Sequence, residues 1–270
     1  MKRTFRVLLA LSLCLFLTAC GVSAPQTDDT REQTQASDLA YVRDKGSLVV
    51  GITEFEPMDY QDATGKWVGF DADMAAAFAK SLGVSVAFKV IEWDNKVAEL
   101  NEKNIDVVWN GMTLNEDVKA AMETSKPYFN NAQVVIVKAD AANQYQSVES
   151  MADASFAVES GSAGQEEANR YGFAYAEVPD QAAALQNVSS GTSDAAIIDF
   201  LMAMTMIGEG TGYDDLTYTV SLSSEEYGVG FRKGSDLAAA LNDFFSASYA
   251  NGTMQSIART YGISAFLLAQ

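Results

Sequence analysis

Residues 47–90 read SLVVGITEFEPMDYQDATGKWVGFDADMAAAFAKSLGVSVAFKV, and this stretch decides the fold. An apolar, β-branched run over 47–53 predicts a buried strand. Apolar residues then recur at helical spacing over 70–82, and Gly83 ends this helix. A second strand is predicted over 84–90. A strand, a helix and a strand in this order indicate an α/β unit with parallel strands.

The same alternation extends past residue 90 and then begins a second time. The first unit continues with helices over 93–101 and 115–122 and a strand over 105–109. The second unit has strands over 155–158, 173–178 and 194–198 and helices over 163–170, 180–188 and 200–207. Helices over 237–249 and 254–261 close the chain. The sequence therefore predicts two α/β units.

Two strong strands, 133–138 and 227–231, bracket the second unit. We therefore expect the chain to cross between two lobes near Val137 and to return near Tyr227. Lobe 1 then comprises residues 39–137 and 227–270, and lobe 2 comprises residues 138–226. A cleft between two lobes is a usual place for a small ligand.

The composition is globular and acidic. Of the 270 residues, 48% are hydrophobic and 10% aromatic, which is enough to build cores. The formal net charge is -18, with no basic cluster beyond the first six residues, which argues against nucleic acid as a partner. The absence of histidine excludes Ser-His-Asp and Cys-His catalysis and HExxH zinc sites. We expect no metal and no other cofactor.

The first 38 residues predict a leader, an anchor and a tether. Cations precede an uncharged apolar run over 7–19, which is typical of a secretory signal and too short to span a membrane. LTACG at 17–21 resembles the bacterial lipobox, which implies removal of residues 1–19 and a lipid on Cys20. The alternative is an ordinary signal peptide with a chance cysteine. Residues 20–38 are polar and predict a flexible tether that holds an extracytoplasmic body at the cell membrane.

Nine blocks of the body follow one another in the order found in one protein family. They are LVVGITEFEPMDY at 48–60, GKWVGFDAD at 65–73, EWD at 92–94, IDVVWNGMT at 105–113, SKPY at 125–128, QVVIVK at 133–138, GSAG at 161–164, DAAIID at 194–199 and YGVGFRKG at 227–234. The chain thereby resembles the bacterial extracellular solute-binding proteins of family 3, which serve polar amino-acid ABC transporters. The resemblance implies a two-lobed, periplasmic-binding-protein-like fold of type II, in which each lobe is a mainly parallel sheet flanked by helices. It also implies two hinge crossings, a small-molecule ligand between the lobes and docking on an ABC permease; we expect a monomer.

The resemblance also identifies an unusual position in the site. In this family an arginine seven residues after the glycine that is Gly111 here typically holds the ligand's α-carboxylate, and that position is Val118. Valine offers no charge-assisted hydrogen bond, and the adjacent Lys119 should point about 100° away on the same helix. Three interpretations stay open. Backbone N–H groups hold the carboxylate alone, the ligand lacks an α-carboxylate, or the carboxylate is held from another direction.

The family's ammonium-binding carboxylate is retained as Asp199. An Asp directly after a buried parallel strand faces the crevice where α/β sheets bind ligands, although it can also serve only as a helix N-cap. Loss of the arginine and retention of Asp199 make the pocket more anionic, and Glu54, Glu56 and Glu159 on nearby loops can add to this. This balance favours a cationic or amine-bearing ligand.

The resemblance implies further ligand-binding residues in both lobes. Phe55 and Trp93 match positions of aromatic side chains that line the ligand, although the Phe55 loop is one residue short and Glu56 could take that place. The remaining candidates lie in the loop after strand 105–109 and at the start of helix 163–170, where N–H groups are unpaired. They are Asn110, Gly111, Met112, Thr113, Val118, Gly161, Ser162 and Ala163.

Three functions are compatible with these residues. The first, which we expect, is a lipid-anchored binding protein that captures an amino acid or a related amine-bearing solute for an ABC importer. The second is an enzyme on the same scaffold, similar to the dehydratases of this superfamily, although no matched acid and base are visible. The third is a surface interaction lipoprotein whose pocket has decayed.

Overall fold

The computed structural model describes residues 37–270. The predicted signal peptide, Cys20 and the tether up to residue 36 lie outside the described residues. Ser37 caps the first helix, α1 (Asp38–Lys45), by accepting a 2.9 Å hydrogen bond from the N–H of Ala40. Asp38 is buried and pairs with Arg232 at 2.9 Å, so the folded body begins one residue before the predicted start at Leu39.

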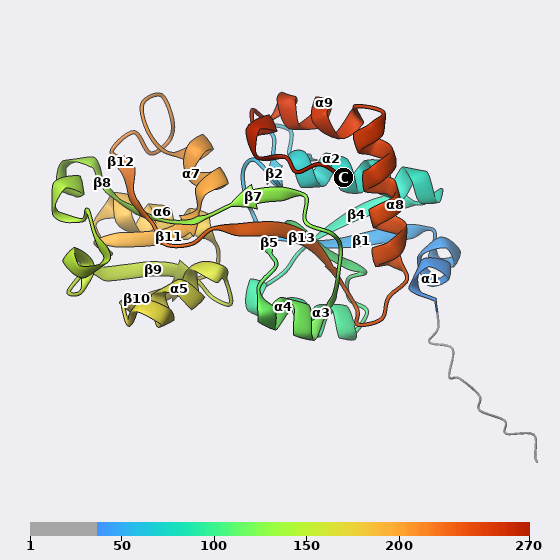
Figure 1. Cartoon of the computed structure of the whole chain (residues 1–270), viewed down its shortest axis with the longest axis horizontal. Helices are drawn as coiled ribbons and strands as arrows, with labels where there is room; N and C mark the ends of the chain where they lie inside the picture. The colour runs from blue at the N-terminus through green and yellow to red at the C-terminus, as the bar shows by residue number, and fades with distance from the viewer. Residues whose placement is uncertain (1–36) are drawn as a thin grey trace, which may run out of the picture. The chain divides into compact units, whose positions relative to one another are not determined.

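The first lobe is built on a sheet with the strand order β4-β1-β5-β13-β6, in which β7 also pairs with β13 (Figure 1). Its strands are β1 (Ser47–Ile52), β4 (Ser85–Val90), β5 (Val107–Thr113), β6 (Glu123–Thr124), β7 (Phe129–Asn131) and β13 (Glu225–Phe231). Its helices are α1, α2 (Phe70–Leu82), α3 (Lys96–Asn101), α4 (Glu116–Ala121), α8 (Leu237–Ala250) and α9 (Thr253–Thr260). A hairpin of β2 (Tyr60–Gln61) and β3 (Trp67–Val68) and the short 3₁₀ turns η1 (Trp93–Asn95) and η4 (Ser264–Phe266) complete this lobe.

The second lobe is built on a sheet with the strand order β10-β9-β11-β8-β12. Its strands are β8 (Gln133–Lys138), β9 (Ser155–Glu159), β10 (Ala174–Val178), β11 (Ala195–Asp199) and β12 (Leu216–Ser221). Its helices are α5 (Ala163–Tyr171), α6 (Gln181–Ser190) and α7 (Phe200–Met206), with the 3₁₀ turns η2 (Ala139–Gln144) and η3 (Val148–Met151). β9, β10 and β11 are parallel, whereas β8 and β12 run antiparallel to their neighbours.

The predicted α/β class and type II architecture are confirmed, and α2 spans the predicted residues. Both sheets are mixed rather than mainly parallel as predicted, because β13 pairs antiparallel with β5 in the first and β8 pairs antiparallel with β11 in the second. The crossings lie elsewhere than predicted. β7 belongs to the first sheet and β8 to the second, so the chain crosses at Ala132 rather than near Val137. It returns between β12 and β13, at residues 222–224, just before the predicted Tyr227. The 133–138 strand pairs antiparallel with β11, a long-range partner that the local sequence pattern does not reveal.

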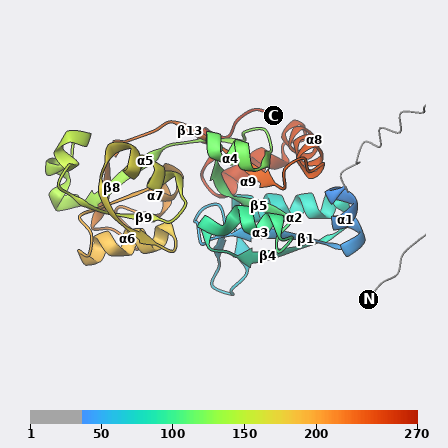
Figure 2. The same ribbon diagram turned by 90° about the horizontal axis from the view of Figure 1, so that it is seen from below.

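Alternation along the strands gives the second sheet two apolar faces. Ala168 of α5 packs in one cluster with Val135 and Ile197, whereas Leu185 of α6 packs in another with Ile136. α5 and α6 therefore cover opposite faces, and Figure 2 shows them on the two sides of the strands. Because both faces are covered, only the ends of the strands are open to a ligand.

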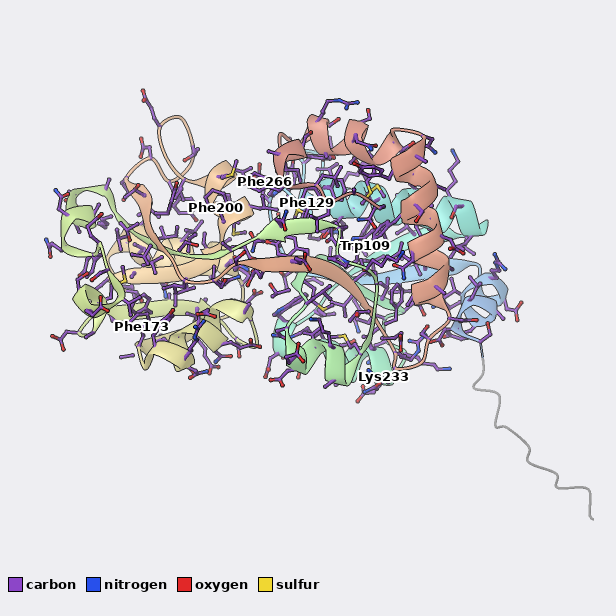
Figure 3. All side chains as sticks on the ribbon, viewed as in Figure 1. Trp109, Phe129, Phe173, Phe200, Lys233 and Phe266 are labelled. Atoms are coloured by element: carbon purple, nitrogen blue, oxygen red, sulfur yellow. The ribbon has the colours of Figure 1, made fainter. Side chains whose placement is uncertain are left out.

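Aromatic side chains fill the core of each lobe (Figure 3). Trp109 of β5 is fully buried and contacts Phe245 of α8 with ring centroids 5.6 Å apart, so it is a core residue rather than a pocket residue. In the second lobe Phe173 stacks on Phe156 at 4.4 Å. No helix among residues 37–270 is long and apolar enough to cross a bilayer.

Candidate functional site

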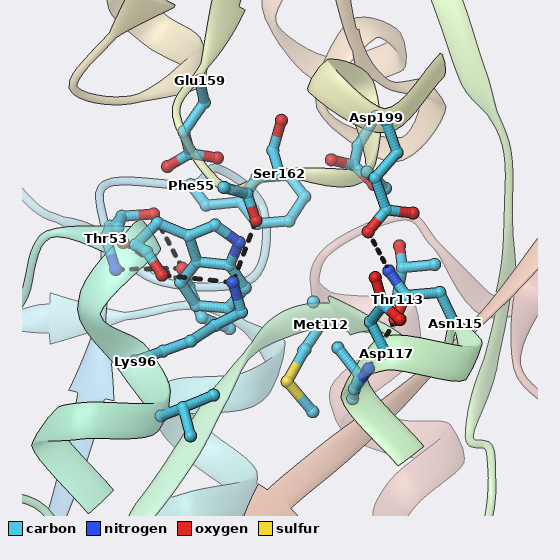
Figure 4. A pocket seen from close by; sticks show the side chains of 18 of the residues that line it. Thr53, Phe55, Lys96, Met112, Thr113, Asn115, Asp117, Glu159, Ser162 and Asp199 are labelled. Atoms are coloured by element: carbon cyan, nitrogen blue, oxygen red, sulfur yellow. Dashed lines mark hydrogen bonds between the residues drawn. The ribbon is translucent and has the colours of Figure 1, made fainter. Parts of the chain in front are cut away.

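A cavity of about 180 Å³ lies between the two lobes. The first lobe lines it with Thr53, Phe55, Trp93, Lys96, Val97, Asn110, Gly111, Met112, Thr113, Asn115, Asp117, Val118, Ala121 and Met122. The second lobe lines it with Glu159, Gly161, Ser162, Ala163, Glu166, Gln181 and Asp199. Figure 4 shows Glu159 and Asp199 on one side of the cavity and Lys96 and Thr113 on the other.

The structure brings all eleven predicted ligand-binding residues to this one cavity. They are Phe55, Trp93, Asn110, Gly111, Met112, Thr113, Val118, Gly161, Ser162, Ala163 and Asp199. Phe55, not Glu56, faces the cavity, and Glu54 is also absent from its wall. Lys119 points away, as expected, and lies 3.5 Å from exposed Glu116.

Asn110 to Thr113 form the end of strand β5 rather than a loop after it. Two buried acids hold this segment. Asn110 donates to Asp59 at 2.8 Å and accepts from the Thr53 hydroxyl at 2.7 Å, while the N–H of Gly111 donates to Asp71 at 2.7 Å. Burial raises the pKa of Asp71 to about 7. The buried side chains of Asp59 and Asp71 therefore hold this edge of the cavity in place.

Gly111 fits its place because it has no side chain. Its φ is +56°, and a Cβ there would lie 2.3 Å from Cε1 of Phe55. The bare backbone lets the Phe55 ring lie against β5, where it also meets Tyr227 edge-on at 6.3 Å. Phe55 is thereby held as a wall of the cavity.

Asp199 ends β11 and stands at the N-cap position of α7, but its carboxylate makes no capping bond. Its Oδ1 instead accepts hydrogen bonds from Asn131 at 2.5 Å, Gln133 at 3.1 Å and the Tyr227 hydroxyl at 2.6 Å. Its Oδ2 accepts from Gln181. Burial, and then the nearby charge of Glu225, raise the pKa of Asp199 to about 7. Asp199 thus lines the cavity and also accepts hydrogen bonds from residues that lie beside the two crossings.

Glu159 at the end of β9 is buried without a complete set of partners. Its side chain is 3% exposed, and its Oε1 has no hydrogen-bond partner among the described residues. Burial raises its pKa to about 8, with further contributions from the negative charges of Asp199 and Asp180. A buried carboxylate facing a cavity favours either a proton or a cation in that cavity.

Sequence reasoning named Glu159 only as a nearby loop residue and missed Lys96, Gln181, Asn115, Asp117 and Glu166. Glu159 follows a strand of the second sheet as Asp199 does, and this shared position was the available signal. Lys96 gave no such signal, since a lysine on a short helix ordinarily faces solvent. Among residues 37–270, no group of three or more Cys, Asp or Glu side chains is arranged to hold a metal ion.

The two lobes touch across and beside the cavity. Lys96 Nζ donates to the Gly161 carbonyl at 2.9 Å, and Asn115 donates to Glu166. Away from the cavity, Phe200 of α7 meets Phe266 with ring centroids 5.8 Å apart (Figure 3). The structure therefore has the lobes in contact beside the cavity that lies between them.

Two α/β lobes, two crossings and a polar cavity between the lobes define a two-lobed solute-binding protein of type II. The chain belongs to the bacterial extracellular solute-binding proteins, family 3, whose model matches residues 48–264. This confirms the family that the nine sequence blocks indicate.

Named relatives cover most of the chain. It is 29% identical to the L-cystine-binding protein TcyJ of Escherichia coli over 83% of this chain and 85% of TcyJ. It is 26% identical to the arginine-binding extracellular protein ArtP of Bacillus subtilis over 97% of this chain and 98% of ArtP. A crystal structure of a mutant of ArgBP from T. maritima superposes with a TM-score of 0.78 at 28% identity, over 83% of this chain and 99% of that one.

One relative is an enzyme. The cyclohexadienyl dehydratase of Pseudomonas aeruginosa is 27% identical over 150 residues, 55% of this chain and 53% of the enzyme. The match is shorter than those to the L-cystine-binding TcyJ and the arginine-binding ArtP, and another relative, GlnH of Bacillus subtilis, is the glutamine-binding protein of an ABC transporter. The family function is therefore amino-acid binding for an ABC transporter.

The buried acid beneath β5 makes stability depend on pH. The pKa of Asp71 is about 7 in the folded chain and 3.8 ordinarily, so folding is fully supported by this group below pH 4 and loses that support as pH rises through 7. Asp71→Asn removes the effect and still accepts from Gly111. Urea unfolding at pH 5 and pH 8 should show wild type losing about 2–4 kcal/mol relative to Asp71→Asn. Parallel curves for the two proteins would contradict the assignment.

Proposed function

We propose that this protein captures an amino acid with a positively charged side chain, or a related amine, and delivers it unchanged to an ABC permease. The observation that carries the proposal is Glu159, a buried carboxylate that faces the cavity with an unpartnered oxygen. A cationic group on the ligand would supply the missing partner by a charge-assisted hydrogen bond.

The charge balance of the wall supports a cationic ligand. Four carboxylates line the cavity, Asp117, Glu159, Glu166 and Asp199, against one ammonium, that of Lys96, among the described residues. A positively charged solute favours the ionised form of these carboxyl groups, whereas a neutral or anionic solute leaves the proton of Glu159 in place. Trp93 and Phe55 also line the cavity, where aromatic rings can contact a cation.

Capture would proceed by closure of the lobes. Thr113 and Asn110 belong to the first lobe and Glu159 and Asp199 to the second, so a ligand bound to both sets stabilises the closed form. We propose that the lobes turn about the crossings at Ala132 and at residues 222–224. We also propose that the protein acts as a monomer.

Calorimetric titration of residues 37–270 with L-arginine, L-lysine, L-ornithine, L-glutamine and L-cystine tests the proposal. We expect the three cationic amino acids to bind at least 30-fold more tightly than the neutral ones, and mass spectrometry to recover the bound compound unchanged. Tighter binding of L-glutamine or L-cystine would contradict the proposed ligand class, and turnover would contradict capture without chemistry.

The ionisation of Glu159 should make the affinity for a cationic ligand depend on pH. Below pH 8 the free protein holds a proton on Glu159, and a bound cation favours the ionised form, so binding releases that proton. The affinity for L-arginine should therefore rise from pH 6 to pH 8 and level above it. Glu159→Gln should weaken binding at least 10-fold and reduce the rise between pH 6 and pH 8 to the part that Asp199, with a pKa of about 7, contributes. The same profile in both proteins would remove Glu159 from the site.

Gly161 provides a test of closure that leaves the carboxyl groups of the cavity wall unchanged. A Cβ there would lie 2.7 Å from Cα of Asp94 in the opposite lobe, so Gly161→Ala should wedge the lobes and weaken L-arginine binding at least 10-fold. Gly172 is the matched control, because it has the same φ of +71° and no neighbour within 4 Å of its Cβ position. Both variants bear the same backbone strain, so equal losses of affinity would contradict closure at Gly161.

We also propose that a lipid on Cys20 anchors the protein to the outer side of the cell membrane, on the strength of the LTACG sequence at 17–21. Two acyl chains provide firm attachment to a bilayer. In cells fed radiolabelled palmitate, wild type should incorporate label and sediment with membranes, whereas Cys20→Ser should carry no label. Equal labelling of the two proteins would contradict lipidation at Cys20.

A further inference from the structure

Lys96 places a buried ammonium at the wall of the cavity. The residue is 9% exposed and begins helix α3. Its Nζ donates to the carbonyl of Trp93 at 3.2 Å and to the carbonyl of Gly161 in the opposite lobe at 2.9 Å, and it lies 4.9 Å from the centroid of the Trp93 indole. An ammonium has three N–H donors, so two are used by carbonyls and one remains.

This ammonium has no ion-pair partner within the described part of the chain. Arg232 and Lys45, by contrast, each have a carboxylate oxygen within 4.0 Å. The Nζ of Lys96 has none, although Glu159, Asp94 and Glu166 are near enough to favour its charge. Burying an unpaired charge is costly, and burial accordingly lowers the pKa of Lys96.

The wall beside Lys96 is also positively polarised. Gly161 precedes helix α5, and Ser162 caps that helix by accepting from the N–H of Gln165 at 3.1 Å. An α-helix cannot satisfy its first N–H groups internally, and Ala163, the first residue of α5, lines the cavity. One part of the cavity thus joins a helix N-terminus to a buried ammonium, while the carboxyl groups of Glu159 and Asp199 line another part.

We propose that Lys96 binds an anionic group of the ligand, most simply the carboxylate of an amino acid, through its remaining N–H donor. The inference rests on the proposed function and deepens it, since the ligand then needs a negative group as well as its positive ones. Simple amines and polyamines lack that group. The ligand is therefore an amino acid with a cationic side chain, whose negative end meets Lys96 and whose positive groups meet Glu159 and Asp199.

Val118 is consistent with this arrangement. Its side chain lines the cavity but offers no donor, and Lys96 reaches the cavity from the neighbouring helix α3. Of the three interpretations that the sequence leaves open, this one has the carboxylate held from another direction. The competing role for Lys96 is a latch that joins the lobes through Gly161 and touches no ligand.

The two roles differ in which ligands they affect. A carboxylate-binding lysine acts only on ligands that have a carboxylate, whereas a latch acts on every ligand. L-arginine and L-argininamide are the probes, because they share the side chain and the α-amine and differ only at the carboxyl group. Binding of each is measured by calorimetry to wild type, to Lys96→Met and to Lys119→Met, a control that removes one exposed lysine outside the cavity.

We expect wild type to prefer L-arginine over L-argininamide at least 10-fold. Lys96→Met should weaken L-arginine binding at least 30-fold and change L-argininamide binding less than 3-fold, while Lys119→Met should behave as wild type. Melting curves with and without ligand verify that each variant is folded. Lys96→Arg, which keeps the charge, should restore part of the preference.

Three results would overturn the inference. Equal weakening of both probes by Lys96→Met would assign the latch role, and equal affinity of wild type for both probes would mean that no carboxylate is recognised; both leave the proposed cationic ligand intact. Binding of neither probe by folded wild type would overturn the proposed function together with the inference.

Discussion

The organisation of this protein depends on carboxylates held away from water between two lobes. Burial makes the charged form of Glu159 and Asp199 unfavourable, and each lies at the carboxyl end of a strand where the second sheet opens onto the cavity. Such groups can keep a proton or acquire a positive partner. A solute that brings positive charge relieves this cost only when both lobes surround it, so recognition and closure have one physical origin.

Asp199 connects this constraint to the crossings. Its Oδ1 accepts from Asn131 at the end of β7 and from Tyr227 of β13, and Asn131 also donates to Glu225 at 2.7 Å. Two acids thus share donors from strands that run beside the crossings. A ligand that changes the charge of Asp199 acts on the same hydrogen bonds that hold those strands, which gives the binding event a direct route to the hinge.

Much of the fold could be predicted because its signals are local. The period of apolar residues and a glycine in the left-handed conformation at Gly83 fix the bounds of α2, and strand ends in an α/β sheet predict where Asp199 faces. The membership of β8 in the second sheet could not be predicted, since it depends on antiparallel pairing with β11, some sixty residues away. The extension of β5 through Asn110 to Thr113 depends in the same way on pairing with β13.

The residues of the candidate site were likewise predictable only where the signal is local. Residues recognised by motif all line the cavity, whereas the charges that decide its chemistry required the tertiary structure. A lysine at the start of a short helix predicts a solvated side chain, whereas Lys96 is buried against Trp93 and contacts Gly161 of the other lobe. The unpartnered oxygen of Glu159 is likewise invisible in sequence, because a missing hydrogen bond can be recognised only when all neighbours are in place.

The most direct measurement is a crystal structure of the protein with L-arginine. The account predicts a closed molecule with the ligand between the lobes, a guanidinium or ammonium nitrogen within about 3.2 Å of a Glu159 oxygen, and another positive group at Asp199. A ligand bound outside this cavity, or one whose positive groups all lie away from both carboxylates, would contradict it.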